Sequence, residues 1–127
     1  MRPMVAGLLI GLMGCKDKDG DSGAPATFAE VRDEILVPSC GFSTCHGTGT
    51  GGLTLDEDLT AADLVGVAAS GDPTASLVVE GDPDASYLLQ KMRGDSGIVG
   101  TVMPPSGALD AETVGRVEAW IAAGAPP

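Results

Sequence analysis

Cys40-Gly41-Phe42-Ser43-Thr44-Cys45-His46 holds two of the three cysteines and the only histidine of this 127-residue chain. A cysteine followed directly by a histidine, with a second cysteine shortly before it, is typical of covalent haem attachment. In that arrangement two thioether bonds hold the porphyrin and the adjacent imidazole binds the iron. We therefore predict haem c attached through Cys40 and Cys45, with His46 as the proximal iron ligand.

The spacing between the two cysteines differs from the usual haem motif. That motif has two residues between its cysteines, whereas this segment has four. Small residues at positions 41 and 43 allow the longer loop to bulge. A disulfide between Cys40 and Cys45 stays open as an alternative, because free thiols are unusual outside the cytoplasm. The chain would then be a haem-free lipoprotein with a structural or interaction role.

A zinc site accounts for these residues less well. Cys40, Cys45 and His46 supply three ligands, whereas structural zinc normally takes four, mostly cysteine and histidine. No acidic residue is marked out as a fourth ligand, so zinc is not predicted.

The N-terminal residues predict export and lipidation. Arg2 precedes an apolar run over residues 5–13, which is too short to span a bilayer as a helix. Leu12-Met13-Gly14-Cys15 resembles a bacterial lipobox. That resemblance implies cleavage before Cys15 and lipidation of its thiol.

This interpretation divides the chain into three parts. Residues 1–14 are expected to be a lipoprotein signal peptide. Residues 15–26 are expected to be the lipidated cysteine and a flexible tether, because this stretch is polar and lacks an apolar period. Residues 27–125 form the expected domain. It would be held at the bacterial cell envelope by lipid alone, facing the periplasm or the exterior.

The charge of the chain argues against some partners. With 18 acidic and 7 basic residues, the formal net charge is −11. Nucleic acids need basic patches, so no nucleic-acid partner is expected. The acidic surface suits a soluble domain that meets an unidentified redox partner protein. Aromatic residues are scarce, and a haem would fill a core that lacks large side chains.

The apolar pattern predicts an all-α domain. A first helix is expected over residues 28–37, begun by a capping box of Thr27 and Glu30 and ended by Pro38. Further helices are expected over residues 61–67, after Thr60; over about 84–92, before Gly94; and over 111–123, after Asp110. Leu59, Leu64 and Val67 are expected to face the core. The predicted architecture is a small cytochrome c-like bundle of four or five short helices, with long loops around one haem.

The second iron ligand is expected to be a methionine. Met92 and Met103 remain after removal of the signal peptide. Met103 precedes two prolines in a loop, and these stiffen the backbone that would present its thioether. Met92 falls in a predicted helix, where methionine is more often a core residue. We therefore predict Met103 as the distal ligand, with Met92 as the second choice.

The ordered set of motifs resembles a known family. These motifs are Pro-Ser-Cys followed by Cys-His-Gly, Gly-Gly-Leu-Thr-Leu-Asp, Gly-Asp-Pro-Asp-Ala-Ser-Tyr-Leu, Met-Pro-Pro and Trp-Ile-Ala-Ala-Gly-Ala. Together they are similar to the small class I-like cytochrome c domains of planctomycete and myxobacterial envelope proteins. The resemblance implies an all-α fold whose first and last helices pack together beside the haem. It also implies thioethers at Cys40 and Cys45, with His46 and Met103 as the two iron ligands.

The expected function is electron transfer by a monohaem c-type cytochrome. No enzymatic activity is expected, because the single histidine is committed to iron and no nucleophile–base pair is evident. Ligands on both sides of the iron leave no open position for a substrate. A haem sensor with a labile sixth ligand is a further possibility, and carbon monoxide binding to the reduced protein would favour it.

Overall fold

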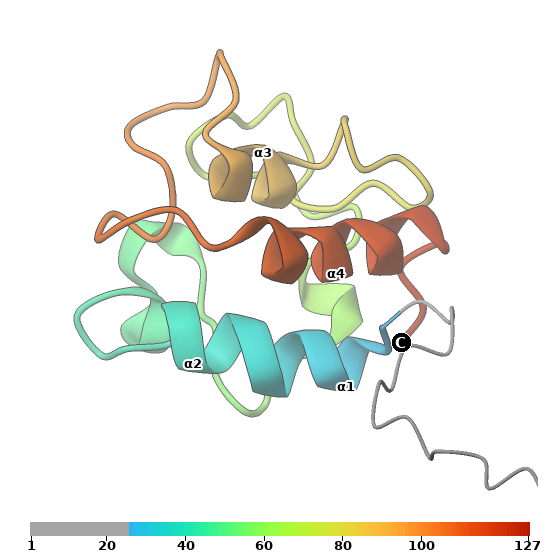
Figure 1. Ribbon diagram of the computed structural model, residues 1–127. Helices are drawn as coiled ribbons and strands as arrows, with labels where there is room; N and C mark the ends of the chain where they lie inside the picture. The colour runs from blue at the N-terminus through green and yellow to red at the C-terminus, as the bar shows by residue number, and fades with distance from the viewer. Residues whose placement is uncertain (1–25) are drawn as a thin grey trace, which may run out of the picture.

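The computed structural model describes residues 26–127. The predicted signal peptide, Cys15 and the tether up to residue 25 lie outside these residues. Within the described range, the chain forms three helices longer than one turn, joined by long loops, and its β pairing is limited to two isolated bridges (Figure 1). The predicted all-α class is confirmed for this part, whereas the predicted number of four or five helices is too high. No helix of residues 26–127 is long and apolar enough to cross a membrane.

The N-terminal helix is continuous from Phe28 to Cys40. It consists of α1 (Phe28–Glu30), a π-helical stretch (Val31–Leu36) and α2 (Val37–Cys40). The predicted capping box begins it. The Thr27 hydroxyl accepts a hydrogen bond from the Glu30 N–H at 3.3 Å, and the Glu30 carboxylate accepts one from the Thr27 N–H at 2.7 Å.

Pro38 does not end this helix, which corrects the prediction. In an α-helix, a proline ring clashes with the carbonyl group four residues earlier. Here the turns before Pro38 are π-helical, and the Val37 N–H bonds to the Arg32 carbonyl five residues back. This wider turn lets the chain pass Pro38 and continue. Cys40 consequently lies in the last turn of the helix rather than in the loop that follows.

Helix α4 (Ala111–Ala122) lies between the N-terminal helix and α3 (Figure 1). Asp110 caps it as predicted, accepting a hydrogen bond from the Thr113 N–H at 2.8 Å. The apolar stripe of this helix is buried, and it comprises Val114, Val117 and Ile121, with Trp120 buried beside them. The Trp120 ring lies 5.4 Å from the ring of Phe28. The helices at the two ends of the described chain therefore pack together, as the family resemblance implies.

Helix α3 (Tyr87–Arg93) ends at Gly94, as the sequence predicts. The φ angle of Gly94 is 72°, a left-handed conformation that glycine adopts without a steric penalty. This sharp end turns the chain from α3 directly into the loop over residues 95–109.

The predicted helix over 61–67 is reduced to a single 3-10 turn, Ala61–Asp63. Beyond it the chain does not continue as a helix but pairs with the segment over residues 76–78 through two isolated bridges, and the Val67 carbonyl accepts a hydrogen bond from the Leu77 N–H at 2.7 Å. Leu59 and Leu64 are buried as predicted. Val67 is 39% exposed, so its expected inward orientation is wrong.

Candidate cofactor site

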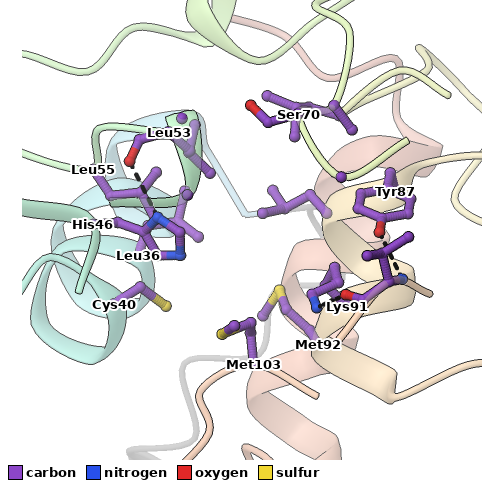
Figure 2. Close-up of a pocket in the computed structure, with 17 residues that line it drawn as sticks. Leu36, Cys40, His46, Leu53, Leu55, Ser70, Tyr87, Lys91, Met92 and Met103 are labelled. Carbon is purple, nitrogen blue, oxygen red and sulfur yellow. Dashed lines mark hydrogen bonds between the residues drawn. The ribbon is translucent and has the colours of Figure 1, made fainter. Parts of the chain in front are cut away.

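A cavity of about 240 Å³ lies between the end of the N-terminal helix, α3 and the neighbouring loops. Its walls are mostly apolar, and four of the predicted site residues line it: Cys40, His46, Met92 and Met103. Figure 2 shows Cys40 and His46 on the side of the N-terminal helix. Met92 lies across from them on α3, with Met103 beside it. Folding thus brings together potential ligands from three separate segments of the chain.

His46 is held in one orientation by the backbone. It begins the 3-10 turn His46–Thr48, and its Nδ1 lies 3.1 Å from the carbonyl oxygen of Leu53. A carbonyl oxygen only accepts hydrogen bonds, so Nδ1 carries a proton, and in the neutral imidazole Nε2 then keeps its lone pair. Metal-binding histidines usually donate their other ring N–H to a carbonyl or carboxylate in this way. In this orientation Nε2 is the ring nitrogen that would bind a metal.

The two cysteines of the motif differ in their surroundings. Cys40 is buried and lines the cavity. Burial, and to a smaller extent the charge of Cys45, raises the pKa of the Cys40 thiol to about 11. Cys45 is half-buried and does not line the cavity, and its sulfur lies 3.9 Å from the Thr44 hydroxyl oxygen. The two sulfurs are not bonded to each other in the structure.

Met92 and Met103 reach the cavity from different elements. Met92 extends from α3 and is 2% exposed. Met103 is half-buried in the loop over residues 95–109, and its N–H donates a hydrogen bond to the Lys91 carbonyl at 2.8 Å. Both thioethers belong to the cavity wall, and Met103 is carried by a loop as predicted.

Three residues that position the site are not evident from the sequence. Leu53 orients His46 through its backbone carbonyl. Tyr87 and Lys91 line the cavity and contact the loop that carries Met103. Most of these contacts are made to backbone groups, which every residue has, so no sequence motif marks them. The one sequence feature that points to them is that Lys91 directly precedes Met92.

The loop between the cysteines leaves no room for a side chain at Gly41. A Cβ atom there would lie 2.7 Å from the Val37 carbonyl oxygen and would overlap that of Leu55. Both are backbone atoms, so neither can swing aside. Gly51 also lines the cavity, and a Cβ atom at that position would lie 3.3 Å from Cε1 of the His46 ring.

Gly41→Ala is expected to lower the free energy of unfolding by about 1–3 kcal/mol, the usual cost of overpacking a tight site. Urea denaturation of the purified full chain measures the change. Gly115→Ala is the matched control, since nothing lies within 4 Å of a Cβ at that helical position. It is expected to raise the free energy by about 0.5–1 kcal/mol. Equal stability of the two variants would contradict the close approach at Gly41.

Comparison of the chain with protein-family models, with curated proteins and with solved structures finds no match. Among residues 26–127, no group of three or more His, Cys, Asp or Glu side chains is placed to hold a metal ion. Thioether sulfur is not among those ligand types. The chemistry of the site is therefore inferred from its own residues, in particular from the His46 imidazole, which faces the thioethers of Met92 and Met103.

Proposed function

We propose that this chain is an envelope-tethered, monohaem c-type cytochrome that transfers electrons. The residues at the cavity fit a haem: an oriented imidazole, methionine sulfur across from it, apolar walls and a cysteine at the wall. His46 and Met103 would be the iron ligands, and Cys40 and Cys45 the points of attachment. A bound haem would supply one-electron redox chemistry, at a potential raised by histidine–methionine ligation.

The observation that carries this proposal is the arrangement of His46 against the methionines. The hydrogen bond to the Leu53 carbonyl leaves the lone pair of Nε2 available, and the cavity contains no other histidine, because the chain has one. The thioethers of Met92 and Met103 face this ring from the other wall (Figure 2). Apolar walls would keep water away from the iron and favour a stable redox couple.

Electron transfer suits this site better than catalysis. Ligands on both sides would leave the iron without an open position for a substrate. The surface is strongly acidic, which favours a redox partner protein with a basic docking face. The lipid on Cys15 would be the contact with the membrane.

The alternative function uses the same two cysteines without haem. Cys40 and Cys45 are separated by four residues, and their sulfurs are not bonded to each other in the structure. A disulfide between them would staple the loop and make the chain a structural or interaction module. This alternative predicts a colourless protein.

Expression of the full chain with a cytochrome c maturation system distinguishes the two functions. The cytochrome is expected to gain the mass of one haem, to show a pyridine haemochrome spectrum and to keep its haem through acid–acetone extraction. Cys15→Ser is the matched control, since it should remove the lipid and leave the haem. A mass equal to that of the polypeptide with its lipid, with no Soret absorption, would overturn the proposal.

Met103→Leu is expected to keep the haem attached while changing its sixth ligand. Loss of the thioether should lower the reduction potential by on the order of 0.1 V, within the roughly 0.8 V range that axial ligands span. Redox titration and the oxidised absorption spectrum measure this change. Met92→Leu is the matched variant on α3 and should leave both unchanged. The reverse result, with the change in Met92→Leu alone, would assign the ligand to Met92.

A further inference from the structure

The loop over residues 95–109, here called the Met103 loop, depends on α3 for its position. It contains no helix, and its glycines at 97, 100 and 107 have positive φ angles. Such a segment has little intrinsic rigidity. Ile98 packs against the core, and hydrogen bonds from α3 hold the part of the loop between residues 99 and 103.

Lys91 supplies most of these hydrogen bonds. Its ammonium group donates to the carbonyl oxygens of Val99 at 2.7 Å and Thr101 at 2.6 Å. Its own backbone carbonyl accepts the Met103 N–H at 2.8 Å. Tyr87, one turn earlier on α3, adds one bond by accepting the Val99 N–H at 3.0 Å.

The partners of Lys91 are unusual for this chain. The chain has 18 acidic residues. Arg32, Arg93 and Arg116, the arginines of residues 26–127, each form an ion pair with a carboxylate. Lys91 forms no such pair among residues 26–127 and instead bonds two neutral carbonyls of one loop. A charged donor makes stronger hydrogen bonds than a neutral one. The ammonium group therefore fixes the Met103 loop rather than balancing surface charge.

We propose that Lys91 is the positioning residue that holds Met103 at the cavity wall. Its side chain fixes residues 99 and 101, and its backbone fixes residue 103, so that the thioether stays beside that of Met92 (Figure 2). The role toward iron rests on the function proposed above, whereas the fixing of the loop does not. Without the ammonium group, the Met103 loop opens and the thioether leaves the wall more often.

The first test measures loop opening by amide hydrogen exchange on the purified full chain, whatever its mass shows about haem. In Lys91→Leu, exchange at the Val99 and Met103 amides is expected to rise at least about tenfold, because hydrogen bonds to a charged donor contribute on that order. Amides within α4 should keep their rates, and Lys91→Arg should restore slow exchange in the loop. Arg116→Leu is the control: it removes one positive charge and a bond to Glu34, away from the loop.

The second test measures access to the iron in the haem-loaded protein. Lys91→Leu is expected to bind carbon monoxide at least about tenfold more tightly when reduced, because the competing thioether is displaced more often. Its reduction potential should fall, and Lys91→Arg should reverse both effects. Unchanged carbon monoxide affinity in Lys91→Leu, or loop exchange equal to that of Arg116→Leu, would overturn the proposal. Protein that matures without haem refutes the cytochrome function alone, since the exchange test still decides the role of Lys91 in the loop.

Discussion

His46→Ala is expected to abolish a stable haem-loaded protein. The chain has one histidine, so no other imidazole is available to bind the iron from that side. The hydrogen bond to the Leu53 carbonyl orients the ring, and alanine has neither the imidazole nor this hydrogen bond. Thioether bonds alone would leave the iron exposed to water and to other ligands. Intact mass and the Soret absorption of protein purified after maturation measure the loss.

The control for His46→Ala is Thr48→Ala in the same 3-10 turn. The Thr48 hydroxyl donates a hydrogen bond to the Ser43 carbonyl at 3.0 Å, and it does not line the cavity. Thr48→Ala should therefore mature with a normal spectrum. A His46→Ala protein with the same haem content and the same spectrum would show that His46 is not an iron ligand.

Helix ends and the apolar stripe of α4 can be predicted from the sequence because they depend on neighbouring residues. The capping box at Thr27, the caps at Thr60 and Asp110 and the helix end at Gly94 all form as predicted. In each case the bonding partners lie within about four residues, so the local pattern contains the necessary information.

Predictions failed where the backbone departs from the conformation that local residue preferences favour. Pro38 normally ends a helix, yet the π-helical turns before it accommodate the ring. The segment around Val67 has the apolar spacing of a helix but pairs with Leu77 instead. Local propensity is a weak guide when a distant segment offers competing hydrogen bonds.

The candidate site divides in the same way. Cys40, His46, Met92 and Met103 are recognisable from their residue types and order, and the cavity contains all four. The motif does not indicate that Cys45 lies outside the cavity wall. The contacts made by Lys91 are not predictable either, because they depend on how the Met103 loop folds back on α3. Sequence patterns thus identify candidate ligands more readily than the groups that position them.

Trp120→Ala is expected to lower the free energy of unfolding by about 3–5 kcal/mol, the usual cost of removing a large buried aromatic side chain. Trp120 is fully buried, its ring contacts Phe28, and its Nε1–H donates a hydrogen bond to the Pro126 carbonyl at 2.9 Å. These contacts join α4 to the start of the helix that carries Cys40 and to the C-terminal residues. Thermal or urea unfolding of the purified full chain measures the change.

Two further variants separate packing from other effects of Trp120. Trp120→Phe keeps an aromatic ring against Phe28 but loses the bond to Pro126, so its loss should be clearly smaller. Phe42→Ala also removes an aromatic ring, but Phe42 is 59% exposed, so the change should stay within about 0.5 kcal/mol. If Trp120→Ala costs no more than Phe42→Ala, packing between the terminal helices does not hold the fold. A loss of about 3–5 kcal/mol in Trp120→Ala would instead show that α4 and the C-terminal residues hold the helix bearing Cys40 in place.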